Sequence, residues 1–230
     1  MKPASRLFFS TTLIVGCIVR LILREASAEP SRSVRDFEEQ RHVILIIDAS
    51  ASMGRLTSGV SHLSAVKDAL VSLQQQGSIP ASAEVWSFGA RLDQSDKEKS
   101  CQDIELFTLG ENEGKEGSGA WRAHVAALEP RGYSSIAFAL DRAAKVTKRA
   151  QARIILITDG EERCGGDPLE VIKNIRSTSR DTVLHIVGLS LDFETKQSLL
   201  TLAAAGGGKL YQPKEITDVS SSILDAMNAE

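Results

Sequence analysis

Apolar positions along the chain follow two different periods. Short apolar runs predict buried strands, and they cover residues 43–47, 84–88, 104–109, 154–157, 183–187 and 209–211. Longer segments repeat an apolar residue every three or four positions, which predicts helices that bury one face. These segments cover residues 63–73, 121–128, 136–146, 168–175, 194–205 and 216–227. Two polar stretches, residues 93–100 and the glycine-rich residues 110–119, are expected to be exposed loops.

This order of elements predicts an α/β fold. Strands that alternate with helices form a mainly parallel sheet covered by helices on both faces, because each crossover is right-handed and carries its helix over the sheet. The strands at 84–88 and 104–109 have no helix between them, so we expect them to pair as a hairpin. The prediction is therefore a doubly wound, Rossmann-like sheet of six strands with one antiparallel edge strand.

The first 28 residues have the layout of a secretory signal peptide. A basic start precedes the apolar residues 7–19, and small residues at 26–28 offer a cleavage site. Arg20 interrupts the apolar stretch, so an uncleaved anchor is a second interpretation, although the uninterrupted run is shorter than the ~20 residues of a membrane span. Lipidation at Cys17 is a third. Each interpretation exports the protein to the periplasm or the medium, or anchors it to the envelope.

The rest of the chain has the composition of one globular domain. Residues 29–40 are polar and lack a period, which indicates a linker, and residues 41–228 form the predicted domain. Hydrophobic residues make up 42% and charged residues 25% of the 230 residues, which is ordinary for a globular protein. The formal net charge of −3 is mixed along the chain, without a long basic run. Nucleic acid is therefore not an expected partner.

Polar side chains follow two of the predicted strands and open one of the helices. Asp48, Ser50 and Ser52 come directly after the first strand, Asp159 follows the strand at 154–157, and Ser134 lies in a turn before a helix. The carboxyl ends of parallel strands meet at one edge of a sheet, where α/β folds place their sites. All the donor atoms are oxygens, which suits a hard cation such as Mg²⁺, with Ca²⁺ or Mn²⁺ as alternatives. The sequence therefore predicts a metal site at this edge.

Each of these residues also has a simpler interpretation when it is taken alone. A Ser or Asp at a strand end can cap the following helix, and only the combination behind two apolar strands favours a metal site. An enzyme is not expected, because the chain contains no G-x-S-x-G, P-loop or G-x-G-x-x-G motif. None of the four histidines joins a metal-ligand spacing; they are His42, His62, His124 and His185.

The three polar clusters together resemble the metal-ion-dependent adhesion site of the von Willebrand factor A family. The D-x-S-x-S motif of that family reads here as residues 48–52, and its strand-end aspartate reads as Asp159. Ser134 stands where the family commonly has Thr, which keeps the hydroxyl but loses the methyl group that restricts the rotamer. The stretches 132–136 and 159–168 are similar to those of bacterial exported members. Some of these members carry the name calcium-activated chloride channel-like.

The resemblance implies a binding module with the von Willebrand factor A fold over residues 41–228. In such a site Ser50 and Ser52 bind the ion directly, Ser134 binds directly or through water, and the two aspartates bind mainly through water. The ion can then accept a carboxylate from an Asp or Glu of a partner protein. A structural module whose metal only fixes its loops is the first alternative, and a metal-dependent hydrolase is the second. A membrane would be reached only through an uncleaved or lipidated N-terminus.

Two cysteines remain once the leader is removed, Cys101 and Cys164. In an exported chain they favour one disulfide, with two free or buried thiols as the alternative. In the topology that the resemblance implies, both cysteines lie on loops at the metal edge of the sheet. We therefore expect a Cys101–Cys164 bond that fixes the loop beside the metal site.

Overall fold

Six strands form one mixed sheet in the order β5–β4–β1–β6–β7–β8. The computed structural model describes residues 42–80, 82–108, 114–147 and 151–229, so the predicted leader and linker lie outside the described residues. The strands are β1 (His42–Asp48), β4 (Glu84–Phe88), β5 (Ile104–Thr108), β6 (Ala152–Thr158), β7 (Val183–Gly188) and β8 (Gly207–Tyr211). Every neighbouring pair is parallel except β4 and β5. The predicted fold class, including the antiparallel edge strand, is confirmed.

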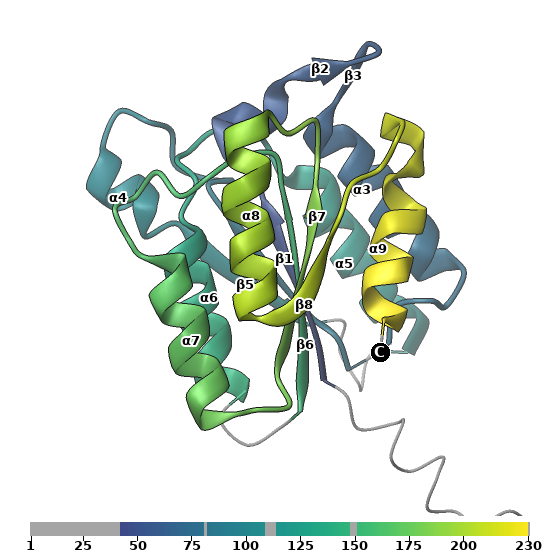
Figure 1. Cartoon of the computed structure of the whole chain (residues 1–230). Helices are drawn as coiled ribbons and strands as arrows, with labels where there is room; N and C mark the ends of the chain where they lie inside the picture. The colour runs from purple at the N-terminus through teal and green to yellow at the C-terminus, as the bar shows by residue number, and fades with distance from the viewer. Residues whose placement is uncertain (1–41, 81, 109–113, 148–150, 230) are drawn as a thin grey trace, which may run out of the picture. The chain divides into compact units, whose positions relative to one another are not determined.

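Helices cover both faces of this sheet (Figure 1). One face carries α3 (His62–Gln75), α5 (Gly114–Ala127) and α9 (Val219–Asn228), and the other carries α6 (Ile136–Thr147), α7 (Pro168–Thr178) and α8 (Phe193–Ala205). The shorter elements are η1 (Ala51–Gly54), β2 (Leu56–Thr57), β3 (Val60–Ser61), α4 (Lys97–Cys101) and η2 (Ile216–Asp218).

The central strand β1 contributes to two separate hydrophobic cores. Its side chains alternate between the faces, so Leu45 and Ile47 pack under α3 and α9 while Ile44 and Ile46 pack under α6 and α7. All four are fully buried. Burial on both faces explains why the strand reads as an unbroken apolar run.

The chain leaves β1 and β6 in opposite directions. After β1 it crosses one face through α3 to reach β4, and after β6 it crosses the other face through α7 to reach β7. Because β1 and β6 are neighbours in the sheet, the loops at their carboxyl ends diverge. Open α/β sheets have their crevices at such switch points, and Asp48 and Asp159 lie here.

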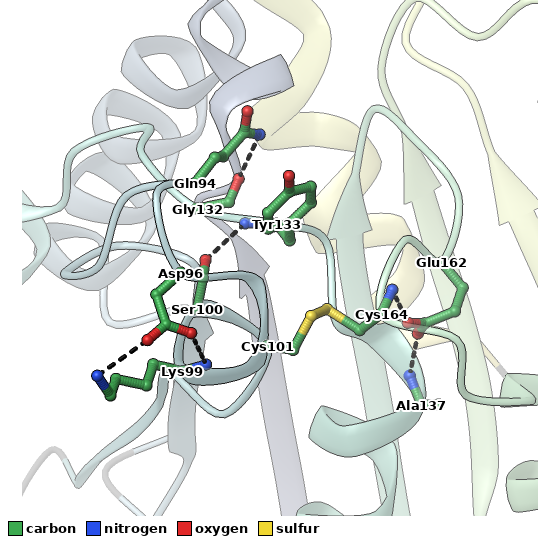
Figure 2. Close-up of a disulfide and its surroundings, with 10 residues drawn as sticks. All are labelled: Gln94, Asp96, Lys99, Ser100, Cys101, Gly132, Tyr133, Ala137, Glu162 and Cys164. Atoms are coloured by element: carbon green, nitrogen blue, oxygen red, sulfur yellow. Dashed lines mark hydrogen bonds and ion pairs between the residues drawn. A yellow bond between two sulfur atoms is a disulfide. The ribbon is translucent and has the colours of Figure 1, made fainter.

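Two expected loops contain helices. The stretch 93–100 includes the start of α4, which begins at the N-cap Asp96 and buries Ser100 and Cys101 (Figure 2). The glycine-rich stretch 110–119 runs into α5 from Gly114 onward. Each glycine costs up to ~1 kcal/mol of helix propensity, and burial of Trp121 and Val125 on the same helix offsets that cost.

The hairpin of β2 and β3 was not predicted. Its two central residues, Ser58 and Gly59, both have positive φ angles, 52° and 83°. This is the backbone of a two-residue hairpin turn, which a Ser-Gly pair supports because glycine adopts positive φ without strain. Among the described residues, none of the helices combines the length and apolar character needed to cross a membrane.

We expect burial of His185 to make the domain sensitive to acid. Its side chain lies in β7 at 1% exposure, and Nδ1 accepts a hydrogen bond from the Lys209 backbone N–H at 3.2 Å. Burial, together with the nearby charges of Arg153 and Lys209, lowers its pKa from 6.5 to about 4. The unfolded chain therefore takes up this proton at higher pH than the folded chain does. The stability is complete above pH 6.5 and is lost progressively as the pH falls toward 4.

The variant His185→Asn keeps an acceptor for Lys209 but cannot take up the proton. Urea unfolding between pH 7.5 and 4.5 should show a shallower loss of stability than in the wild type, by up to ~1.4 kcal/mol per pH unit. His124, whose pKa burial also lowers to about 4, remains in the variant and retains part of the acid sensitivity. Parallel pH profiles for the two proteins would contradict this account.

Candidate metal-binding site

A pocket of about 410 Å³ opens at the carboxyl edge of the sheet, where the loops after β1 and β6 diverge. Ser50, Ser52, Ser134 and Asp159 line it, and Asp48 is fully buried beside them. The structure thus brings together all five residues that the sequence analysis selected. Among the described residues, no group of three or more His, Cys, Asp or Glu side chains is placed to hold a metal. Of the five selected residues, three offer hydroxyl oxygens and two offer carboxylates.

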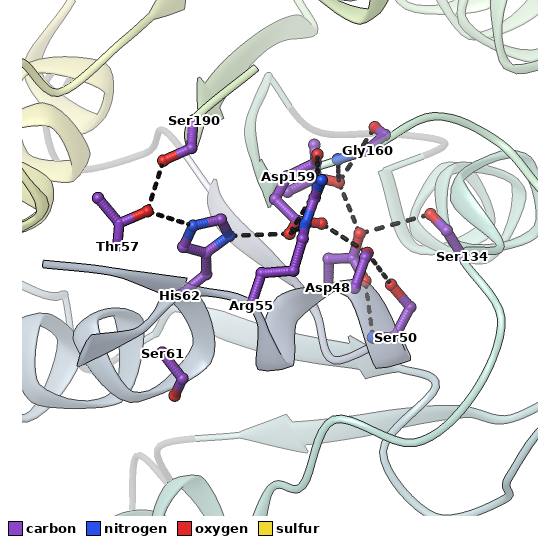
Figure 3. A network of polar contacts seen from close by, with 12 residues as sticks. Asp48, Ser50, Arg55, Thr57, Ser61, His62, Ser134, Asp159, Gly160 and Ser190 are labelled. Atoms are coloured by element: carbon purple, nitrogen blue, oxygen red, sulfur yellow. Dashed lines mark hydrogen bonds and ion pairs between the residues drawn. The ribbon is translucent and has the colours of Figure 1, made fainter. Parts of the chain in front are cut away.

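Asp48 is held by hydrogen bonds to both of its carboxylate oxygens (Figure 3). Oδ1 accepts the Ser50 backbone N–H at 2.8 Å, and Oδ2 accepts the Thr158 hydroxyl at 2.6 Å and the Ser134 hydroxyl at 3.4 Å. Burial raises the pKa of Asp48 to about 6, although these hydrogen bonds oppose the shift. No salt bridge reaches this carboxylate from any residue that the structure describes. A bound cation would supply the missing positive charge.

Asp159 has a different electrostatic environment, because the Arg55 guanidinium and the His62 ring both contact it. Its Oδ2 accepts hydrogen bonds from His62 Nδ1 at 2.8 Å and from Arg55 Nη2 at 3.0 Å. Its Oδ1 accepts a hydrogen bond from the Ser52 hydroxyl at 2.6 Å. Burial alone would raise the pKa of Asp159, but His62, Ser52 and the Arg55 charge together lower it below its usual value. The two aspartates of the site therefore differ in how much of their charge the protein already balances.

Backbone contacts join the loop after β1 to the loop before α6. Ser50 forms an isolated bridge with Gly132, and Ala51 N–H donates to the Gly132 oxygen at 2.9 Å. The Gly132 N–H in turn donates to the oxygen of Gly89 at 2.8 Å, at the end of β4. Gly89 itself has a φ of 71°. These contacts hold the loop that carries Ser134 against the loop that carries Ser50, and a Cβ at Gly132 would be too close to its neighbours.

The loop after Asp159 is fixed by residues of the stretch 159–168, which resembles that of bacterial exported members of the family. Glu162 accepts the backbone N–H groups of Ala137 and Cys164, both at 2.7 Å (Figure 2). The Arg163 N–H donates to the backbone oxygen of Ser134 at 2.9 Å, so this loop supports the neighbouring one. Asp167 caps α7, and Pro168 occupies its first turn.

The structure joins Cys101 and Cys164 in a disulfide, as the sequence analysis expected, with their Cα atoms 5.5 Å apart (Figure 2). The bond ties α4 to the loop after Asp159. The Ser100 hydroxyl, next to Cys101, accepts the Tyr133 backbone N–H at 3.0 Å. The loop that carries Ser134 is therefore held between the two segments that the disulfide connects.

Three residues at the site were missed. Thr158 appeared in the sequence only as the neighbour of Asp159, yet it donates to Asp48. Arg55 and His62 were not selected, and both contact Asp159 from more than 90 positions away in the chain. The Ser-Gly turn was the available signal, since the hairpin that it closes returns the chain from Arg55 to His62.

Comparison with known proteins shows the family of the chain. Residues 42–225 match the von Willebrand factor type A domain. The chain belongs to this family. Two Bacillus subtilis (strain 168) proteins, the uncharacterized YwmD and YwmC, are similar to this von Willebrand factor A domain protein at 29% and 26% identity. The matches cover 82% and 92% of this chain and 85% and 92% of the relatives.

Solved structures show the same fold at lower identity. A von Willebrand factor type A protein from Catenulispora acidiphila matches with a TM-score of 0.59 and 17% identity, and the pilus adhesin SpaC from Lactobacillus rhamnosus GG with 0.59 and 14%. Proximal thread matrix protein 1 from the mussel byssus, with a zinc-occupied MIDAS motif, matches with 0.54 and 14%. These matches cover 81%, 82% and 82% of this chain, but only 41%, 30% and 48% of the solved chains. This chain therefore spans less than half the length of these proteins.

The close packing at Gly132 predicts a cost for the smallest side chain. A Cβ there would lie 2.7 Å from Ser100 Oγ and 2.8 Å from both Gly89 Cα and the Leu92 oxygen. We expect Gly132→Ala to lower the free energy of unfolding by about 1–3 kcal/mol, as overpacking does. Gly119→Ala is the control, because a Cβ there meets nothing within 4 Å. Equal urea midpoints for the two variants would contradict this prediction, because they would mean that the loops around Gly132 accommodate a methyl group without cost.

Removal of the disulfide should lower stability as well. We expect the Cys101→Ser/Cys164→Ser variant to lose about 2–4 kcal/mol, in the chain-entropy model of cross-links. Thermal melts of the variant, the wild type and the wild type with reductant measure this. The reduced wild type should melt near the variant, and free thiols at both Cys101 and Cys164 in the oxidised protein would refute the bond.

Proposed function

We propose that this protein is a metal-ion-dependent protein-binding module. A divalent cation held by Ser50, Ser52 and Ser134, with Asp48 and Asp159 beside them, captures a carboxylate from an Asp or Glu of a partner protein. The observation that carries the proposal is the convergence of four of these side chains from three loops on one open pocket, with Asp48 buried beside them. The family membership supports the same reading.

The residues present fit such an ion. The Ser50 and Ser52 hydroxyl oxygens lie 3.1 Å apart, and the Ser52 hydroxyl donates to Asp159 Oδ1 at 2.6 Å. Oxygen-only donors with bound water suit Mg²⁺, and Ca²⁺ and Mn²⁺ accept the same set. When bound, the cation would supply a Lewis-acidic position for an incoming carboxylate. Neutral serine ligands leave the ion most of its positive charge, so an anionic ligand is attracted to it.

Binding is a better interpretation than catalysis because the histidine at the site is already held by hydrogen bonds. His62 is the histidine at the site, and both of its ring nitrogens are engaged, Nδ1 by Asp159 and Nε2 by the Thr57 hydroxyl at 2.9 Å. Hydrolysis at a metal needs a positioned group that moves a proton. We therefore propose a ligand-binding role, and a metal-dependent hydrolase is the less favoured alternative.

A structural role for the ion is the second candidate, and one observation favours it. The polar groups of the site already bond to each other across the loops, as Thr158 does with Asp48 and Ser52 with Asp159. An ion added to this network could act only to rigidify it. The two roles differ in how strongly the ion affects the stability of the domain.

The partner is expected in an extracytoplasmic compartment. The disulfide suits an oxidising environment, and we propose that the predicted leader exports the chain, whether it is cleaved, retained as an anchor or lipidated. A protein that presents an exposed Asp or Glu is the proposed ligand. Capture of a partner from an envelope extract should require Mg²⁺ and should fail when a chelator is present.

The variant Asp48→Asn separates binding from stability. It keeps an acceptor for the Ser50 N–H but removes the charge, so we expect Mg²⁺ affinity to fall more than tenfold in calorimetric titration, since one ion ligand charge is worth more than ~1.4 kcal/mol. The melting temperature should change little, because the variant loses the buried charge of Asp48 together with the cation that would balance it. Asp68→Asn on the exposed side of α3 is the matched control. If chelation instead lowers the melting temperature of the wild type by much more than a few degrees, the structural role is correct.

Ser134 should limit how tightly the ion is held. Its hydroxyl lies 3.4 Å from Asp48 Oδ2, which is the longest contact among the site hydroxyls. We expect Ser134→Thr to raise Mg²⁺ affinity several-fold, because a β-branched side chain loses less rotamer freedom on binding. Ser134→Ala should weaken binding. Equal affinity of all three proteins would remove Ser134 from the ligand set.

A further inference from the structure

Arg55 is the exposed member of an otherwise buried ion pair. Its side chain is 58% exposed, whereas the Asp159 side chain is fully buried. Nη2 donates to Asp159 Oδ2 and to the Asp159 backbone oxygen, each at 3.0 Å, and Nε donates to Oδ2 at 3.3 Å. Within the described part of the chain, Nη1 makes no hydrogen bond. One edge of the guanidinium is thus anchored, and Nη1 remains available in the pocket that Arg55 lines.

The backbone around Arg55 is also fixed. Its N–H donates to the Ser52 oxygen at 2.9 Å, and its own oxygen accepts the His62 N–H at 3.0 Å. The hairpin that follows is held by Thr57, whose hydroxyl contacts Ser190 Oγ at 3.0 Å (Figure 3). A preorganised arginine loses little conformational freedom when a ligand binds.

The other charges of the pocket narrow the kind of ligand. Glu161, Asp192 and Arg163 also line it, and Asp192 Oδ1 accepts the Thr195 N–H at 2.8 Å as the N-cap of α8. These two acids disfavour a ligand with several negative charges. Arg55 and a cation at the serine hydroxyls provide positive charge on one side of the pocket. This combination suits a ligand with one negative charge and two oxygen atoms.

We propose that Arg55 is the second half of the carboxylate receptor: the cation takes one oxygen of the partner's carboxylate, and Arg55 Nη1 donates to the other. This inference rests on the proposed function, because it requires an ion at the serine hydroxyls. It assigns to Arg55 a role in ligand choice that is separate from its contact with Asp159. Arginine suits this role because its planar fork binds two groups at once.

The test uses Mn²⁺ as the ion and acetate as the carboxylate. Mn²⁺ affinity is measured by electron paramagnetic resonance, and acetate binding to the Mn²⁺-loaded protein is followed by water proton relaxation, which changes when a carboxylate replaces a bound water. The variants are Arg55→Gln, Arg55→Lys and Arg163→Gln. Arg163 lines the same pocket and is exposed, but its side chain makes no described bond to Asp159, so its variant reports the effect of charge alone. Circular dichroism verifies that each variant folds.

We expect Arg55→Gln to bind Mn²⁺ as tightly as the wild type or a few-fold more tightly, since a competing positive charge is removed. Its acetate affinity should fall about tenfold, the size of a charge-assisted hydrogen bond near solvent. Arg163→Gln should lose less than threefold. Arg55→Lys should bind acetate nearly as weakly as Arg55→Gln, because one ammonium cannot hold Asp159 and the ligand together. This variant keeps the test decisive if Arg55→Gln does not fold.

Three results would overturn the inference. An acetate loss in Arg55→Gln no larger than in Arg163→Gln would show that only net charge matters, and the proposed function would stand. If Arg55→Gln lost as much Mn²⁺ affinity as acetate affinity, the role of Arg55 would be only to support Asp159. A wild-type protein that binds no Mn²⁺, or whose bound Mn²⁺ does not respond to acetate, would refute the proposed function and this inference together.

Discussion

The close contact of three backbone segments beneath the pocket is the constraint on which the site depends. The chain at Ser50, at the end of β4 and at Gly132 meets through main-chain hydrogen bonds that leave no space for a side chain at Gly132 and little at Gly89. Main-chain bonds of this kind fix position more firmly than long polar side chains do, because few torsions separate the bonded groups from the fold. The serine hydroxyls are therefore placed by the sheet itself, and their short side chains add little freedom.

The two aspartates show how one residue type serves two purposes within a single site. Burial without a cationic partner raises the pKa of Asp48, whereas His62, Ser52 and Arg55 hold that of Asp159 below its usual value. Asp48 thus provides charge that the protein has not balanced, and Asp159 provides charge that the protein has largely balanced. A cation between them would be attracted mainly to the first side. Asp159 then remains fixed in position, with the positive charge of Arg55 on its exposed side.

The parts that could be predicted from sequence are those that depend on local patterns. Unbroken apolar runs identified β1 and β6, and a strand end followed by Asp fixed the positions of Asp48 and Asp159. The contacts of Arg55 and His62 could not be predicted in this way, because they depend on a hairpin turn and on a partner 104 or 97 positions away. The start of α5 was missed for a related reason. Its glycines indicate a loop locally, while the packing of Trp121 that favours the helix comes from distant segments.

The position of the pocket has a mechanical consequence. Residues before His42 join the domain at the amino end of β1, and the pocket lies at the carboxyl end of the same strand. A pull between a tether and a captured partner would run along β1, which is hydrogen-bonded to parallel strands on both sides. Such a load acts on all the bonds of the two ladders in shear at once, instead of opening them one after another. The Cys101–Cys164 bond adds a covalent limit, since the segment between these cysteines, which contains Ser134 and Asp159, cannot be drawn out of the domain.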